Sequence, residues 1–131
     1  MFQKKFEVST TGRSIVDITN RVNQVIKLAS PTQALCNVFI HHTSASLFIN
    51  ENADPDVQGD LERFFSRLVK DGDSIFQHTE EGPDDMSAHI RSVLTATSLN
   101  IPISSGRCDL GTSQGIYLWE HRHEPHQRKV T

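Results

Sequence analysis

The chain has 131 residues, of which 36% are hydrophobic and 22% charged, and its formal net charge is −3 with the histidines neutral. This length and composition are typical of one globular domain, so we expect a single domain over residues 1–131. A negative net charge argues against nucleic acids or anionic membranes as dedicated partners. The seven histidines make the charge sensitive to mild acid, because imidazoles titrate near neutral pH.

The chain shows no targeting or membrane-spanning signal. Its first residues, MFQKKFEVSTTG, lack the apolar run of a secretory signal, and the longest apolar-leaning stretch, 34–40, is too short to cross a bilayer. Cys36 and Cys108 are too few for a disulfide framework. We expect a cytoplasmic protein in which Cys36 packs as a small apolar side chain, with a disulfide or a metal-binding role as the alternatives.

The first third of the chain is expected to contain a strand, a helix and two further strands. Alternating apolar residues predict an opening strand over 2–8. Apolar residues at helical spacing then predict a helix over 18–29, capped by Asp17 or Thr19. Strands are predicted over 33–42 and 46–50. In the first of these, His42 lies on the same face as the apolar Cys36, Val38 and Ile40.

Two more helices are marked by their first residues. Asp54 followed by Pro55 is a helix start, because a capping carboxylate precedes the residue favoured at the first helical position. An apolar stripe from Val57 to Leu68 follows it. Residues 82–85 open the next helix, and we expect its apolar stripe to face the core. That stripe consists of Met86, Ile90, Val93, Leu94 and Thr97.

The last third of the chain is predicted to be β-structure, with strands over 99–104, 107–110, 116–121 and 127–130. A Ser-Gly turn at 105–106 joins the first two of these strands. About seven strands and three helices predict an α+β fold, with mainly antiparallel sheets.

Three histidines stand where a solvated histidine is not expected. His42 ends the apolar face of a strand, His78 lies in the loop before the third helix, and His89 borders that helix's apolar stripe. A buried imidazole must be hydrogen-bonded or metal-bound, because an unpaired buried polar group costs a few kcal/mol. Three such rings predict a metal site with an open position for water or substrate. Their spacing matches no local metal motif, so ordinary hydrogen-bonded histidines remain the alternative.

The other histidines, His41, His121, His123 and His126, are expected to be mostly solvated. We leave His121 open, because it shares a strand face with aromatic residues.

Carboxylates collect near the same loops. Glu51 is our preferred candidate for the partner of a metal-bound histidine or the general base on a metal-bound water, because it lies at a strand end outside a capping position. Asp84 and Asp85 are explained more simply as first-turn carboxylates that interact with the helix dipole. Glu120 shares a face with apolar residues, so we expect it to be buried and paired.

Three separated motifs resemble the YjbQ family, described as secondary thiamine-phosphate synthase-like proteins. The first is HTSASLFINENADPDV at 42–57, and the second is EGPDDMSAHI at 81–90. The third combines Gly-Arg, Gly-Thr, Gln-Gly-Ile and Glu-His-Arg between 106 and 122. The chain departs from the family at Ser113, where the family usually has tryptophan. This puts in doubt any stacking of a substrate at that point.

The resemblance implies a small α+β protein with a β-sandwich-like core that assembles as a homotrimer. It also implies that His42, His78 and His89 bind a metal ion in a cleft near a subunit boundary. A site rich in histidine favours zinc or another transition ion, with magnesium as the alternative.

The family activity joins an aminopyrimidine diphosphate to a thiazole phosphate and expels pyrophosphate. Such a transferase needs cations near the leaving group, and Arg107 is our candidate, with Arg91 and Arg122 as further matches. We expect this activity on a small phosphorylated substrate to be weak. Metal-dependent hydrolysis with Glu51 as the base, and a non-catalytic trimeric metal- or ligand-binding protein, remain open.

Overall fold

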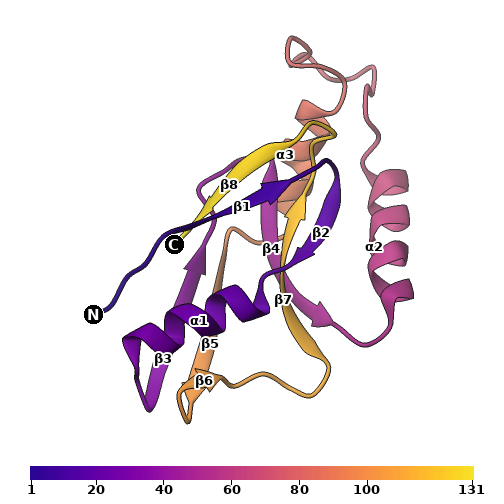
Figure 1. The fold of residues 1–131 in the computed structure, drawn as a ribbon. Coiled ribbons are helices and arrows are strands. Elements are labelled where there is room, and N and C mark those ends of the chain that lie inside the picture. Colours follow the sequence, from indigo (N-terminus) through magenta and orange to yellow (C-terminus); the bar gives the residue numbers. More distant parts are fainter.

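The computed structural model describes all 131 residues and contains eight strands and three helices (Figure 1). In chain order they are β1 (Phe6–Thr10), β2 (Ser14–Asp17), α1 (Thr19–Ala29), β3 (Gln33–Phe39), β4 (Ala45–Glu51), α2 (Pro55–Leu68), α3 (Asp85–Leu94), β5 (Ser98–Ser104), β6 (Arg107–Cys108), β7 (Gln114–Glu120) and β8 (His126–Val130). The predicted α+β class is therefore confirmed. None of the helices combines the length and the apolar character that a membrane span requires.

The strands form three small antiparallel sheets, with the orders β2-β7-β4, β3-β5-β6 and β1-β8. Single bridges connect them, from Ile40 to Val130 and from Leu47 to Ala96. In Figure 1 the β5–β6 hairpin and the loop that leads into α3 lie at opposite ends of the molecule. This separation decides which predicted site residues can meet within one chain.

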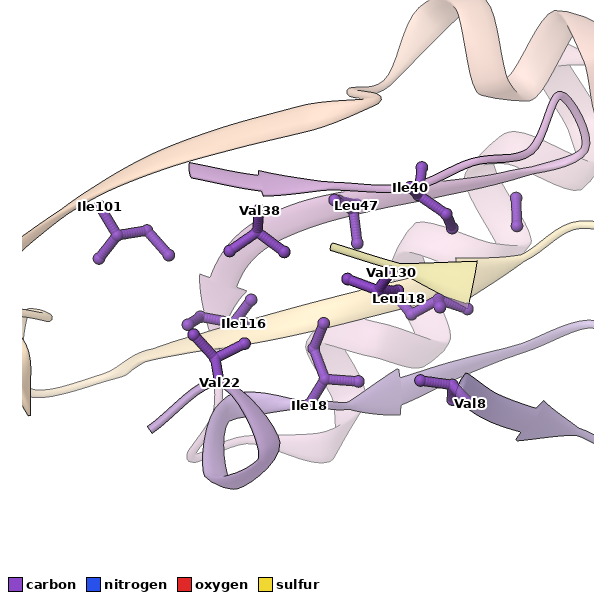
Figure 2. Close-up of a cluster of buried hydrophobic side chains, with 11 residues drawn as sticks. Val8, Ile18, Val22, Val38, Ile40, Leu47, Ile101, Ile116, Leu118 and Val130 are labelled. Atoms are coloured by element: carbon purple, nitrogen blue, oxygen red, sulfur yellow. The ribbon is translucent and has the colours of Figure 1, made fainter. Parts of the chain in front are cut away.

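The hydrophobic core lies between the sheets and draws on all three of them and on α1 (Figure 2). Its buried members are Val8, Ile18, Val22, Val38, Ile40, Ala45, Leu47, Ile101, Ile116, Leu118 and Val130. Burying each of the larger aliphatic side chains contributes about 1.5–3 kcal/mol. Cys36 and Cys108 pack against this core as free thiols, and burial raises the pKa of Cys108 to about 11.

Local signals in the sequence place several elements correctly. The Asp54 carboxylate accepts a hydrogen bond from the Asp56 amide at 2.9 Å, and Pro55 begins α2. The predicted turn between β5 and β6 is also present, with left-handed backbone at Ser105 (φ 53°) and Gly106 (φ 74°). The opening strand begins later than predicted, because Phe2 is exposed and the pairing with β8 starts at Phe6.

The prediction that the apolar stripe of α3 faces the core is wrong. Val93 and Leu94 are 82% and 54% exposed, whereas the buried residues of the helix are Asp85, Ser87, Ala88, Arg91 and Ser92. The inward face of α3 can be polar because its charges find partners on other elements, which offsets the cost of removing them from water.

The apolar stripe of α2 is also poorly covered. No residue of α2 is buried, and Phe64 and Leu68 are 50% and 56% exposed.

Candidate metal centre

Two of the three predicted histidines meet around one carboxylate. His78 comes from the loop before α3, Asp85 is the first residue of α3, and His89 lies one helical turn further on the same face. One ligand atom from each residue lies within 4.8 Å of the other two. The Asp85 Oδ2 atom is 2.7 Å from His78 Nε2 and 3.0 Å from His89 Nε2. The carboxylate is buried, but His78 and His89 are 45% and 31% exposed, so solvent reaches the cluster through the histidines.

The hydrogen bond on the far side of the His89 ring determines which nitrogen is free. His89 Nδ1 lies 2.9 Å from the carbonyl oxygen of Thr43. A carbonyl only accepts, so Nδ1 carries the hydrogen and a neutral ring has its lone pair at Nε2. That lone pair faces Asp85 Oδ2, which is another acceptor. The contact is favourable only when a proton on the ring or a metal cation supplies positive charge.

Arg122 holds the second oxygen of the same carboxylate. Its Nη1 donates to Asp85 Oδ1 at 2.7 Å. Burial opposes ionisation of Asp85, but the hydrogen bond from His78 and the charges of His89 and Arg122 outweigh it. Together they hold the pKa of the Asp85 carboxyl below its usual value. Asp85 therefore stays ionised at neutral pH.

A small cavity of about 260 Å³ borders the cluster. It is formed by the loop between α2 and α3, and its lining includes Asp73, Phe76 and His78. A space of this size accommodates several waters or a small molecule next to the exposed histidine.

The structure does not bring the ring of His42 into this cluster. His42 Nε2 accepts a hydrogen bond from the Lys129 amide at 2.7 Å, and its Nδ1 lies 3.3 Å from Arg128 Nη1. Burial, followed by the charge of Arg128, lowers the pKa of His42. The next residue, Thr43, contacts His89 through its carbonyl, but the His42 ring is hydrogen-bonded to residues of β8. In one chain, Asp85 takes the position that the three-histidine prediction gave to His42.

The two predicted catalytic residues are also distant from the cluster within one chain. Glu51 is the last residue of β4, whereas Thr43 lies just before the strand begins, so the length of the strand, about 20 Å, lies between them. The Glu51 carboxylate instead accepts a hydrogen bond from the Ala53 amide at 2.8 Å. Arg107 is exposed on the β5–β6 hairpin, at the end of the molecule opposite α3 (Figure 1). The geometry of a single chain supports neither role.

His121, which the sequence left open because of its aromatic strand face, is buried rather than solvated. The ring is completely buried, and its Nδ1 accepts from Arg91 Nε at 3.0 Å. Burial, followed by the charges of Arg91, Arg13 and Arg128, lowers the pKa of His121 to about 2. The remaining hydrogen is on Nε2 and donates to Ser46 Oγ at 2.8 Å. A ring that donates to the hydroxyl cannot deprotonate it, so this pair is not a catalytic serine–histidine dyad.

Arg91 and Glu120 belong to buried ion pairs. Arg91 is fully buried, and its Nη2 donates to both carboxylate oxygens of Glu62 at 2.7 and 2.8 Å. Glu120 accepts from Thr10 Oγ1 and from Arg128 Nε, both at 2.7 Å, which confirms the prediction that it is buried and paired. The sequence carried no local signal for the first pair, because Glu62 and Arg91 lie 29 residues apart.

Known proteins of one family are similar to this chain over nearly its whole length. The family model "UPF0047 protein YjbQ-like" matches residues 4–131. The UPF0047 protein sll1880 of Synechocystis is 50% identical, covering 98% of this chain and 87% of the relative. The UPF0047 protein YjbQ of Escherichia coli O157:H7 is 41% identical, covering 98% and 94% of the two chains.

Solved structures give the same result. An uncharacterised conserved protein of the YjbQ/UPF0047 family from Clostridium acetobutylicum superimposes with a TM-score of 0.90 at 34% identity, covering 98% of this chain and 97% of its own. A conserved hypothetical protein from Thermus thermophilus gives a TM-score of 0.88 at 31% identity, with the same coverage of 98% and 97%. The chain therefore belongs to the UPF0047 family of YjbQ-like proteins.

Proposed function

We propose that this protein binds a divalent transition-metal ion through His78, Asp85 and His89 and uses it on a small substrate. The observation that carries the proposal is the hydrogen bond from His89 Nδ1 to the Thr43 carbonyl at 2.9 Å. Metal-binding histidines commonly donate their other ring N–H to a carbonyl or carboxylate, which leaves the free nitrogen for the ion. Here that nitrogen meets a second imidazole and a carboxylate oxygen.

The donor set fits zinc or a related ion better than magnesium. Two imidazoles and one carboxylate are ligands that zinc, cobalt and iron accept, whereas magnesium prefers oxygen ligands and keeps several waters. Three protein ligands leave a coordination position open, as in catalytic zinc sites. When bound in such a site, the ion supplies Lewis acidity and lowers the pKa of bound water.

Among reactions, the surroundings of the cluster favour hydrolysis of a small substrate. The exposed His78 ring borders the 260 Å³ cavity, which gives a substrate access to the ligands. Transfer to a thiazole phosphate requires cations that are free to hold pyrophosphate. Arg91 and Arg122 are instead committed to carboxylates. We therefore propose that thiamine-phosphate formation, the activity that the family resemblance implies, is a weak side reaction.

Metal titration of the purified protein tests the site. The chain is stripped of metal, and Zn²⁺ and Co²⁺ binding are measured by calorimetry for the wild type and for His89→Ala and His78→Ala. We expect one ion per chain and at least about 100-fold weaker binding in both variants, since they lose ligands rather than supporting contacts. His41→Ala, at an exposed histidine, is the control. If the wild type binds no stoichiometric metal, or His89→Ala changes only stability, the metal site is excluded.

The variant His42→Ala separates the two possible ligand sets. We expect it to retain metal affinity within about threefold, because its ring is bonded to the Lys129 amide of β8. A loss as large as that of His89→Ala would instead identify His42 as a ligand.

A turnover screen then separates an enzyme from a binding protein. The metal-loaded and metal-free proteins are compared on panels of small esters, amides and phosphoesters, and on an aminopyrimidine diphosphate with a thiazole phosphate. We expect metal-dependent hydrolysis in at least one panel and slow release of pyrophosphate from the last pair. Stoichiometric metal without any metal-dependent reaction would support the non-catalytic binding protein.

We further propose that the protein is a cytoplasmic homotrimer. The trimer comes from the family resemblance, and the exposed apolar side chains of Phe64, Leu68, Val93 and Leu94 support burial of these helices against other copies. The free thiols Cys36 and Cys108 suit the reducing conditions of the cytoplasm.

A further inference from the structure

Arg122 connects the beginning of α3 to the segment between β7 and β8. Its side chain is 9% exposed, and each of its three nitrogens donates to an acceptor. Nε donates to Asp84 Oδ2 at 3.1 Å, Nη1 to Asp85 Oδ1 at 2.7 Å, and Nη2 to the Glu81 carbonyl at 3.0 Å. The guanidinium is therefore unavailable to a substrate and acts on the residues that carry the cluster.

The orientation of this guanidinium is itself fixed. The Arg122 amide donates to Glu120 Oε2 at 3.1 Å, and Asp84 Oδ2 also accepts from the His123 amide at 2.8 Å. A planar guanidinium with donors in three directions can hold two carboxylates and a carbonyl at once, which a lysine ammonium on a flexible chain cannot reproduce. Asp85 is thus held from the side opposite to the two histidines.

We propose that Arg122 is a positioning residue that restricts Asp85 to one ligand oxygen and thereby sets the metal preference of the site. The proposal rests on the metal centre proposed above. Because Oδ1 is occupied by Arg122, only Oδ2 is directed toward His78 and His89. One oxygen with two imidazole nitrogens favours Zn²⁺ and Co²⁺. Ions that prefer several oxygen ligands, such as Mn²⁺ and Mg²⁺, gain from a carboxylate that can bind through both oxygens.

The variant Arg122→Lys tests this role through metal binding alone. Competition titrations measure the affinities for Zn²⁺ and Mn²⁺ in the wild type, in Arg122→Lys and in Asp84→Asn. Asp84 is the matched control, because it binds the same guanidinium but has no hydrogen bond to either histidine. We expect Arg122→Lys to weaken Zn²⁺ binding by about 100-fold and Mn²⁺ binding by no more than about tenfold, so that the Zn²⁺/Mn²⁺ affinity ratio falls at least about tenfold. In Asp84→Asn the ratio should stay within about threefold.

The outcomes distinguish the two proposals. If the wild type binds metal and Arg122→Lys keeps the wild-type ratio, Arg122 supports only the fold and the present inference is overturned. If the wild type binds no metal at all, the metal centre itself is excluded, and so is the proposed role of Arg122 in its metal preference. Thermal unfolding of each variant, recorded in parallel, separates loss of the site from loss of the fold.

A measurement on the unmodified chain covers the case in which Arg122→Lys does not fold. The side-chain N–H signals of Arg122 are followed by NMR while Zn²⁺ is added. We expect them to shift as the first equivalent binds, because the carboxylate that they contact becomes a ligand. The Arg91 signals serve as the internal control, since that guanidinium is paired with Glu62 and His121. Binding of one equivalent without a shift at Arg122 would overturn the proposal.

Discussion

His121 lies just beyond β7, and both of its ring nitrogens are hydrogen-bonded inside the protein. Its pKa of about 2 in the folded chain is far below the ordinary value of 6.5. Below pH 6.5 the unfolded chain therefore binds a proton that the folded chain excludes. The contribution of the neutral His121 to the free energy of unfolding is therefore fully present above pH 6.5. It decreases as the pH falls, by about 1.4 kcal/mol per pH unit well below pH 6.5. Burial is the main reason why the charged ring is disfavoured, and the positive charges of Arg91, Arg13 and Arg128 add to it.

The first prediction is that His121→Gln makes the stability less dependent on pH. Glutamine can donate to Ser46 and accept from Arg91 but does not titrate. The free energy of unfolding, measured with urea, should fall between pH 7 and pH 5 by about 2 kcal/mol less in the variant than in the wild type. The variant His41→Gln, at an exposed histidine, should follow the wild type. Equal pH dependence in wild type and His121→Gln would show that the folded chain protonates His121 as readily as the unfolded chain does.

The second prediction concerns the buried pair of Glu120 and Arg128. Arg128 is 3% exposed, so Glu120→Ala leaves its charge buried without a carboxylate. Breaking a buried pair from one side costs about 3–5 kcal/mol, and we expect a loss of that size in chemical denaturation. Glu124→Ala, at an exposed carboxylate on the same segment, should change the stability by less than about 0.5 kcal/mol. A small effect of Glu120→Ala would mean that water reaches Arg128.

At the scale of elements, the sequence predicts what local chemistry determines. The start of α2 follows from Asp54 and Pro55, and the hairpin between β5 and β6 follows from Ser105 and Gly106, because these residues define their own backbone geometry. The alternating apolar residues also place the central strands. The buried face of α3 could not be predicted in this way. Burial of Arg91 depends on Glu62 and His121, which come from distant parts of the sequence.

The same distinction applies to the candidate metal centre. His78 lies 7 residues before Asp85, and His89 lies 4 residues after it. One short segment of the chain is therefore enough to bring the three side chains together. The sequence alone explains Asp85 as a first-turn carboxylate, because that role is sufficient in most helices. The direction of the His42 ring depends on how β8 lies beside it. That arrangement is tertiary and leaves no pattern in the residues around His42.

The third prediction tests the local signal at the start of α2. Asp54→Ala removes the side-chain acceptor for the Asp56 amide and should lower the free energy of unfolding by about 1 kcal/mol. Asp54→Asn keeps an acceptor oxygen at the same place and should recover most of this loss. Thermal denaturation of the three proteins at one pH makes the comparison. No difference between alanine and asparagine would mean that the hydrogen bond does not contribute.

At the scale of the whole molecule, the packing of a single chain does not explain the apolar side chains that α2 and α3 leave exposed. Phe64 and Leu68 on α2 and Val93 and Leu94 on α3 are each at least half exposed, although their spacing is that of a packed helix face. Each helix thus presents a pair of neighbouring exposed apolar side chains, and neighbouring apolar side chains mark interaction sites more often than those that are scattered singly. A second copy of the chain is the partner that the family resemblance implies, and burial of these side chains would give both helices the apolar contacts that a single chain does not provide.

The fourth prediction is that the protein in solution has about three times the 14.7 kDa mass of one chain, measured by light scattering during size-exclusion chromatography. Val93→Glu, at a side chain that is 82% exposed, should shift the mass toward one chain, because a carboxylate buried between copies is strongly disfavoured. Leu28→Glu on α1, at a side chain 64% exposed, is the control for surface charge. A wild-type mass of one chain at micromolar concentration would exclude the trimer. A trimer that tolerates Val93→Glu would place the interface away from α3.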